Sequence, residues 1–317
     1  MNHIPVLLNE VIEGLEIKSD SVFIDATLGL GGHSVAIAEK FGKNLKMIGI
    51  DKDIDAITEA TERVKKVGNK IFTYNGSFAE IAKALDLATK SPKGDLVAKK
   101  ADAILFDLGI SSYQLDESMR GFSFMRDEPL LMTMERAGVN KLSAKEIVNE
   151  WDEENIADII YGYGEERYSR RIAKFIVEYR QTKEINTTFE LVEIIKNAVP
   201  ASYRHQKTHF ATRTFQALRI AVNDELQTIK KALSASMEIL NIGGRIAVIS
   251  FHSLEDRIVK RLFKEYKDEN IGELITKKPI TSSKKEIKEN PRSRSAKLRI
   301  IEKHDKNKIT NKNKYRK

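Results

Sequence analysis

The stretch SVFIDATLGLGGHS, residues 21–34, decides the fold that we expect for this chain. Ser21–Ala26 is rich in β-branched and aromatic side chains and predicts a short buried strand. The glycine-rich segment Leu28–Gly32 follows, and a helical pattern covers Ser34–Phe41. A strand, a glycine loop and a helix in this order are typical of a βα unit with a ligand site at the carboxyl end of its strand.

The same alternation continues through the first third of the chain and returns near its end. Helical patterns separate apolar runs, as expected for a parallel sheet that is covered on both faces. The further predicted strands are Lys46–Ile50, Ile71–Tyr74, Ala101–Phe106, Arg245–Ser250 and Leu298–Ile301. The helices predicted with them are Asp55–Val67, Phe78–Ala88, a long Phe215–Leu240 and Leu254–Tyr266.

The strand pattern is absent from Tyr113 to about Phe215, and four amphipathic helices are expected there instead: 143–150, 153–161, 169–181 and 188–197. Capping boxes are predicted at Ser143 with Glu146 and at Thr187 with Glu190. We therefore predict an α/β fold: a Rossmann-like domain, residues 1–112 and 216–302, with an inserted all-helical substrate-recognition domain, residues 113–215. A basic, disordered tail is expected at residues 303–317.

Composition excludes several classes of protein. The 317 residues are 41% hydrophobic and 32% charged and include no cysteine. Without cysteine there are no disulfides, thiolate metal sites or cysteine nucleophile, and we expect a protein of the reducing cytoplasm. The sequence contains no run of about 18 apolar residues, so that no membrane span is predicted. No spacing of His, Asp or Glu resembles a set of metal ligands.

The net charge of +8 is concentrated at one end of the chain. From Lys277 to Lys317, sixteen Lys and Arg residues stand against four acids, so that the rest of the chain is mildly acidic. Such asymmetry is typical of a segment that faces nucleic acid. Residues 303–317 alone are better explained as a solvated terminus.

The glycine loop and the acid that follows it favour an adenosine-containing ligand. Asp51 lies 22 residues after Gly29, where a carboxylate can bind both ribose hydroxyls. A dinucleotide fingerprint would need glycine at position 34, which is Ser34, and no G-K-[ST] phosphate loop is present. Because Asp25 also directs a carboxylate toward the loop, S-adenosylmethionine is favoured over NAD. The alternatives are that Asp51 only caps the next helix and that His33 is only a capping or packing residue.

Two further turns follow predicted strands at the same sheet edge. In the first, Asp107, Ser111 and Ser112 could accept hydrogen bonds from an amino group, or they could form an ordinary turn. In the second, His252 could receive a proton or hold a base, or it could belong to a capping cluster.

From end to end, the sequence closely resembles the RsmH (MraW) family of 16S ribosomal RNA cytosine-N4 methyltransferases. The stretches that carry the resemblance are HIPVLLNEV (His3–Val11), DATLGLGGHS (Asp25–Ser34), GIDKD (Gly49–Asp53), DLGISSYQLD (Asp107–Asp116), RGFSFMRD (Arg120–Asp127), ATRTFQALRIAVNDEL (Ala211–Leu226), SFHSLEDRIVK (Ser250–Lys260) and NPRSRSAKLR (Asn290–Arg299). The chain departs from the family pattern at Glu128, Leu131 and Thr133, where the family has Gly, Asp and Arg.

The resemblance implies a Rossmann-like S-adenosylmethionine-dependent methyltransferase sheet with an inserted helical domain. It implies methylation of the exocyclic N4 amine of a cytosine in the decoding centre of 16S rRNA, within the small ribosomal subunit. It also implies that the cofactor site is lined by Gly31, Gly32, His33, Asp51, Phe78, Asp107 and Gln114. Two alternatives are a DNA amino-methyltransferase and a cofactor-binding ribosome assembly factor.

The chemistry gives Asp107 a candidate catalytic role. Methylation of ring carbon C5 generally needs a cysteine nucleophile, which this chain lacks, whereas an exocyclic amine can attack the methyl group directly. Asp107 could orient that amine or the methionine part of the cofactor. Candidate RNA phosphate contacts fall in three groups: Arg167, Arg170, Arg171 and Lys174; Arg204, His205, Lys207, His209 and Arg213; and Arg292, Arg294, Lys297 and Arg299.

Overall fold

The structure is a computed structural model that describes residues 4–90, 99–110, 115, 118–135 and 142–305. The chain divides into two compact units. The sheet unit comprises residues 1–109 and 226–317, and the helical unit comprises residues 110–225. In the described ranges, no helix has both the length and the apolar character that a membrane span requires.

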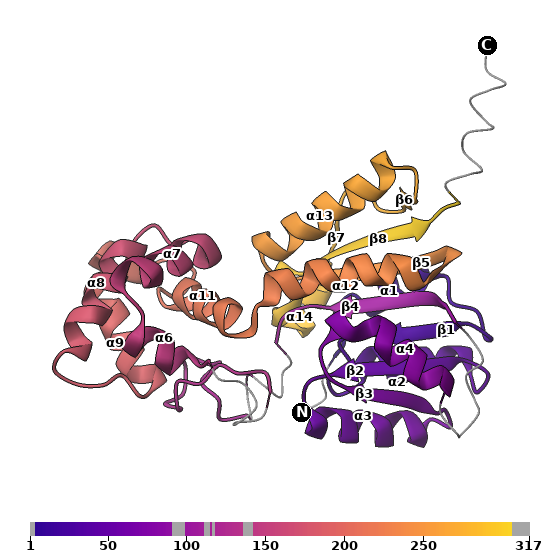
Figure 1. Ribbon diagram of the computed structural model, residues 1–317, viewed down its shortest axis with the longest axis horizontal. Coiled ribbons are helices and arrows are strands. Elements are labelled where there is room, and N and C mark those ends of the chain that lie inside the picture. The colour runs from indigo at the N-terminus through magenta and orange to yellow at the C-terminus, as the bar shows by residue number, and fades with distance from the viewer. Residues whose placement is uncertain (1–3, 91–98, 111–114, 116–117, 136–141, 306–317) are drawn as a thin grey trace, which may run out of the picture. The chain divides into compact units, whose positions relative to one another are not determined.

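The sheet unit is built on one mixed sheet with the strand order β3-β2-β1-β4-β5-β8-β6, in which β7 also pairs with β8 (Figure 1). The strands are β1 (Val22–Asp25), β2 (Lys46–Asp51), β3 (Ile71–Asn75), β4 (Ala101–Asp107), β5 (Leu240–Ser250), β6 (Gly272–Leu274), β7 (Ile280–Thr281) and β8 (Lys297–Lys303). Pairing is parallel from β3 to β5 and antiparallel at β8. The predicted α/β class and strands are confirmed, whereas β6 and β7 were not predicted.

Helices cover both faces of this sheet because its strands bury side chains alternately to each side. In β4, Ile104 and Phe106 belong to the core beneath α4, α12 and α13, while Ala103 and Leu105 belong to the core beneath α1 and α2. The helices of the sheet unit are α1 (Leu8–Leu15), α2 (Gly32–Phe41), α3 (Ile54–Lys66), η1 (Phe78–Glu80), α4 (Ile81–Lys90), α12 (Glu225–Ile239), α13 (Ser253–Asp268), α14 (Lys284–Glu289) and η2 (Pro291–Ser295).

The helical unit has an apolar core of its own. Its helices are α6 (Ala144–Glu150), α7 (Glu153–Gly164), α8 (Ser169–Arg180), α9 (Thr188–Ala198), α10 (Ala201–Arg204) and α11 (Thr212–Asn223). Both predicted capping boxes are present, at Ser143 with Glu146 and at Thr187 with Glu190. In each box the Ser or Thr side chain accepts from the amide of the Glu, and the Glu carboxylate accepts from the amide of the Ser or Thr.

The stretch that departs from the family pattern is folded into this unit. The Glu128 side chain is buried, and its Oε2 accepts a hydrogen bond from the Gly121 amide at 2.9 Å. The Glu128 amide in turn donates to Thr188 Oγ1 at 3.1 Å, at the start of α9. Glu128 therefore fixes the local turn through backbone contacts.

The prediction of one long helix over Phe215–Leu240 is wrong, because the helix is interrupted at Asp224. This residue has φ 47°, in the left-handed region, and ends α11 before α12 begins. Asn223 reinforces the break by donating its side-chain amide to the carbonyls of Met132 and Arg219. The two compact units divide after residues 109 and 225, whereas the sequence suggested 112 and 215.

The tail was expected to begin at Lys303, but Lys303 is the last residue of β8. Its ammonium group donates to the carbonyls of Met237 and Leu240 at 2.6 and 2.9 Å. Burial lowers the pKa of Lys303, and the nearby Lys100 adds to the effect. Lys303 is therefore part of the fold, and residues 306–317 lie outside the described residues.

An ion-pair cluster joins β8 to α13. Asp256 Oδ1 accepts from Arg299 Nε at 2.6 Å, and Asp256 Oδ2 lies 3.3 Å from Lys297 Nζ. Burial alone would raise the pKa of Asp256, but the hydrogen bonds and charges of Arg299 and Lys297 outweigh it and hold the pKa below its usual value. Arg299 is 8% exposed. The expected phosphate contact by Arg299 is therefore replaced by a structural role.

Replacing Asp256 with asparagine should destabilise the sheet unit by about 3 kcal/mol near pH 7, because the buried Arg299 charge loses its partner. The difference in stability between the variant and the wild type should narrow as the pH falls below about 4, because the Asp256 carboxylate of the unfolded chain is protonated there, whereas that of the folded protein is protonated only at a lower pH. Urea unfolding at both pH values measures this. Asp268→Asn, at an exposed position of the same helix, serves as the control, and an equal loss in that variant would contradict the assignment.

Candidate active site

The glycine loop between β1 and α2 is held in place by neighbouring strands. The Ala26 amide donates to Leu105 O of β4, and the Leu28 amide donates to Ile50 O of β2, both at 2.9 Å. Gly31 caps α2 with φ 73°, and a Cβ there would lie 3.0 Å from the Ala60 Cβ. The loop therefore needs glycine at position 31 both for its backbone conformation and for its close approach to α3.

Asp51 ends β2 and ties the loop to that strand. Its Oδ2 accepts from the Gly29 amide at 2.7 Å, and its Oδ1 accepts from the Asp53 amide at 2.9 Å. The expected alternative, that Asp51 caps the next helix, does not apply, because Asp53 is the N-cap of α3. Burial raises the pKa of Asp51. Since a carboxylate has about four acceptor sites, roughly two remain for a ligand.

Asp25 ends β1 and is buried beneath the loop. Its Oδ2 accepts from the Ser34 hydroxyl at 2.7 Å, and its Oδ1 accepts from the Thr27 amide at 3.2 Å. Burial raises the pKa of Asp25 to about 6 despite these bonds. Asp25 is thus a structural acid with both oxygens satisfied by the loop.

Asp107 ends β4, next to β1 in the sheet. Its amide donates to Thr27 Oγ1 at 2.6 Å, which fixes the strand end against the loop. Its side-chain Oδ1 is buried and has no hydrogen-bond partner. Burial raises the pKa of Asp107 to about 8, and the charges of Asp25 and Glu255 add to this. An unsatisfied buried acceptor of this kind is suited to a donor on a bound ligand.

His33 lies in the first turn of α2 and is 5% exposed. Its Nε2 lies 3.0 Å from the Val6 carbonyl, which can only accept, so that Nε2 carries a hydrogen. Its Nδ1 lies 3.7 Å from Asp107 Oδ2. His33 therefore both packs the helix start, as the simpler interpretation had it, and faces the Asp107 carboxyl.

The segment after β5 also reaches this edge of the sheet. His252 is the N-cap of α13 and forms a capping box with the buried Glu255. Glu255 Oε2 accepts from the amides of Phe251 and His252, at 2.8 and 3.2 Å. The structure thus gives His252 the capping role that was weighed against a catalytic one.

Phe78 follows β3 in η1, where it packs edge-on against Phe106 of β4 with ring centroids 5.9 Å apart. It is partly buried, so one side of the ring belongs to the core. Gly32 is the first residue of α2. Gln114, Ser111 and Ser112 lie outside the described residues.

Of the expected site residues, Gly31, Gly32, His33, Asp51 and Asp107 are brought together through the loop contacts above. Thr27 and Glu255 were not singled out from the sequence. Thr27 has no signal beyond its place in the loop, whereas Glu255 could have been recognised as the third residue after His252, in the pattern of a capping box.

The expected phosphate contacts in the helical unit are partly engaged within the protein. Arg167 lies over the rings of Tyr168 and Tyr203, and Arg213 donates to the Glu165 carbonyl. The His209 ring stacks on that of Phe124 with the ring centroids 4.5 Å apart, and burial lowers the pKa of His209. Arg167, Arg213 and His209 therefore each have a contact within the helical unit itself.

Comparison with known proteins decides the family, because residues 1–304 match the MraW methylase family. The chain belongs to the MraW methylase family. A relative from Clostridium botulinum (strain Kyoto / Type A2) is 49% identical over 317 residues, covering 95% of this chain and 98% of the relative. One from Finegoldia magna is 44% identical with the same coverage. Both relatives carry the name Ribosomal RNA small subunit methyltransferase H.

Membership of the MraW methylase family makes the protein a methyltransferase with S-adenosylmethionine as its methyl donor. The sheet edge fits this cofactor. β1, β2 and β4 each end in an aspartate, and carboxylates suit the hydroxyl donors of a ribose and the positive charges of an ammonium and a sulfonium group. The partnerless Asp107 Oδ1 is the strongest single indication of fit.

In the absence of cofactor, Asp107→Asn should stabilise this MraW-family protein above neutral pH. Because the pKa of Asp107 is raised to about 8, the folded protein keeps a proton that the unfolded chain releases near pH 4. Stability therefore falls as the pH rises from about 4 to about 8, by up to about 5 kcal/mol. The amide does not titrate and escapes this loss.

Urea unfolding of the two proteins across that range measures the effect. The variant should be the more stable protein near pH 8, and the two should converge near pH 4. A stability difference that is the same at both ends of the range would contradict the raised pKa.

Proposed function

We propose that the protein transfers a methyl group from S-adenosylmethionine to the exocyclic N4 amine of a cytosine in 16S rRNA, in the decoding centre of the small ribosomal subunit. The observation that carries the proposal is the Asp107 carboxyl at the end of β4, whose buried Oδ1 lacks a hydrogen-bond partner. The names of relatives that are 44–49% identical over nearly the whole chain support an rRNA substrate.

The cofactor-binding residues that we propose are Gly31, Gly32, His33, Asp51, Phe78, Asp107 and Gln114. Asp51 would accept hydrogen bonds from the ribose hydroxyls with the acceptor sites that Gly29 and Asp53 leave free. Gly31 and Gly32 allow the backbone to approach the ligand closely. Phe78, whose ring stands nearly perpendicular to that of Phe106, offers a ring face to the adenine.

The reaction requires an amine whose lone pair is available. S-adenosylmethionine supplies a methyl group on a positively charged sulfur, which is the electrophile. In a cytosine the N4 lone pair is delocalised into the ring, and an acceptor on the amine protons localises it. Asp107 either accepts from that amine and takes up its proton, or orients the methionine part of the cofactor. A positive charge nearby lowers the pKa of Asp107 and favours the carboxylate that both roles need.

The choice of N4 over ring carbon C5 follows from the nucleophile that each route needs. Addition at the ring generally needs a cysteine thiolate, and this chain has no cysteine. Direct attack by the amine needs only alignment of nitrogen, methyl carbon and sulfur, together with an acceptor.

Asp107→Ala and Asp107→Asn should slow methyl transfer by about 100-fold, because neither side chain can accept as a carboxylate does. Single-turnover rates at saturating cofactor measure the chemical step. Asp86→Asn, an exposed acid on α4, should leave the rate unchanged. Equal rates for wild type and both Asp107 variants would remove the chemical role.

The substrate class can be tested directly with isotope-labelled cofactor and three acceptors: isolated small ribosomal subunits, naked 16S rRNA and duplex DNA. We expect label in the subunits, at N4-methylcytidine when the digested RNA is examined by mass spectrometry. Label in DNA would identify a DNA amino-methyltransferase. Cofactor binding with no transfer to any acceptor would identify an assembly factor.

A further inference from the structure

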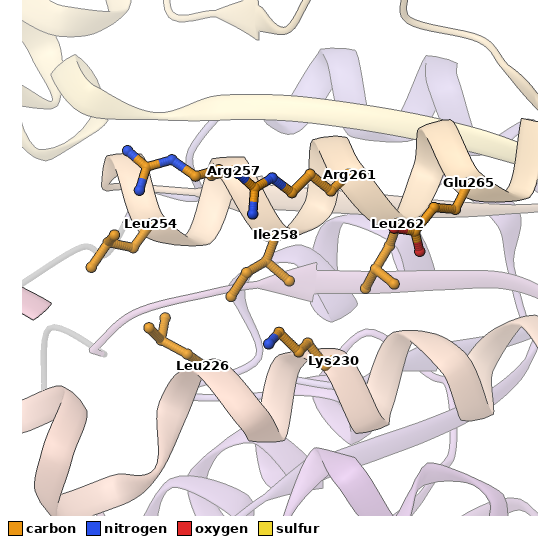
Figure 2. A pocket seen from close by; sticks show the side chains of 8 residues that line it. All are labelled: Leu226, Lys230, Leu254, Arg257, Ile258, Arg261, Leu262 and Glu265. Carbon is orange, nitrogen blue, oxygen red and sulfur yellow. The ribbon is translucent and has the colours of Figure 1, made fainter. Parts of the chain in front are cut away.

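A cavity of about 370 Å³ lies between α12 and α13 on the sheet unit. Its floor is aliphatic, with Leu226 from α12 and Leu254, Ile258 and Leu262 from α13. The three α13 residues are four positions apart and therefore form one row along the helix. Figure 2 shows Ile258 and Leu262 pointing toward α12, with Leu226 pointing back from the opposite side. We call this cavity the α12–α13 groove.

Cationic side chains accompany the aliphatic floor. Lys230 from α12 and Arg257 and Arg261 from α13 line the groove, and each is exposed (Figure 2). Glu265 lies at one end as the single acid among the lining residues. The groove therefore combines an apolar row with positive charge along its length.

We infer that the α12–α13 groove binds an acidic amphipathic helix of a partner protein. A helix with apolar side chains three and four positions apart would place them on the Leu254–Ile258–Leu262 row. Acids flanking that stripe would then meet Lys230, Arg257 and Arg261. The row from Leu254 to Glu265 spans about 16 Å, or three helical turns, which sets the length of helix that the groove accommodates.

The lining favours a peptide over a nucleic acid. Proteins that bind single-stranded nucleic acid stack the bases mainly on aromatic side chains, with a smaller contribution from Arg. None of the residues that line this groove is aromatic, so that only Arg257 and Arg261 could stack on a base. A phosphate backbone would use the cationic side chains but leave the aliphatic floor without a partner. An acidic amphipathic helix satisfies both.

None of the residues that line the groove is among the proposed cofactor-binding or catalytic residues. The Leu254 end of the groove adjoins Glu255, which lies near Asp107, but Lys230, Arg257 and Arg261 have no part in the proposed chemistry. Binding to the groove is also measured without cofactor or RNA, so that failure of this inference leaves the proposed function unaffected.

The test uses the full-length protein and two synthetic fluorescein-labelled peptides of about 16 residues. The acidic peptide has leucines along one helical face and glutamates beside them. The second peptide has lysine in place of every glutamate. Fluorescence anisotropy reports the dissociation constant of each. We expect the acidic peptide to bind more tightly than the lysine peptide by about tenfold or more.

A double variant, Lys230→Glu with Arg261→Glu, should bind the acidic peptide with a dissociation constant about tenfold higher than that of the wild type. It should bind the lysine peptide more tightly than the wild type does. The matched control is Lys260→Glu with Lys264→Glu. These residues are exposed on α13 and do not line the groove, so the control should bind the acidic peptide as the wild type does. Circular dichroism of both variants checks that they fold.

Three results would overturn the inference. Equal affinity for the two peptides would show that the charge of the groove does not select its occupant. An equal loss of affinity for the acidic peptide in the Lys260/Lys264 control would show that the peptide is attracted to the positive charge of α13 in general. A single-stranded RNA that displaces the acidic peptide, and whose own binding falls in the Lys230/Arg261 variant, would assign the groove to nucleic acid.

Discussion

Parallel pairing brings the carboxyl ends of β1, β2 and β4 to one edge of the sheet, and in this chain each of these strands ends in an aspartate. Three acids gathered at one edge repel one another and lose water as the glycine loop packs over them. The hydrogen-bond donors that stabilise these three carboxylates are divided unequally among them. Asp51 receives two backbone amides, Asp25 receives an amide and a hydroxyl, and one Asp107 oxygen receives nothing.

The unequal compensation separates structural acids from the one that is left for chemistry. The pKa of Asp25 rises to about 6, whereas that of Asp107 rises to about 8, because Asp107 lacks comparable donors and has two acids nearby. An acid held in this way costs stability in the free protein and gains a partner when a positively charged ligand arrives. The sheet edge is thus arranged for binding at the expense of folding.

Much of the sheet unit could be predicted because its signals are local. Apolar runs predicted the six longer strands, and the loop sequence predicted where a ligand would bind. The short strands β6 and β7 could not be predicted, because two or three residues carry no period and pair only once β8 is in place. The break at Asp224 was missed for a related reason. The apolar pattern continues across it, and its cause includes the contact between Asn223 and the distant Met132 carbonyl.

The places in the fold of the candidate site residues were predictable to a similar depth. Residue types and spacing identified Asp51 and Asp107 as the acids that follow two strands. What the sequence did not contain is how each oxygen is used, since that depends on the backbone amides of Gly29 and Asp53 and on the Thr27 hydroxyl. Arg299 shows the converse. Its charge suggested a surface contact, but the fold pairs it with Asp256.

Because β8 supplies an inner strand between β5 and β6, the sheet unit cannot close until residues near position 303 have been synthesised. The helical unit is continuous in sequence, from Ile110 to Glu225, and has all its own contacts available much earlier. During translation, the inserted unit can therefore fold while the domain that surrounds it in sequence is still incomplete. The glycine loop precedes the whole helical unit in the sequence, yet the sheet on which it lies is complete only when β8 has been added.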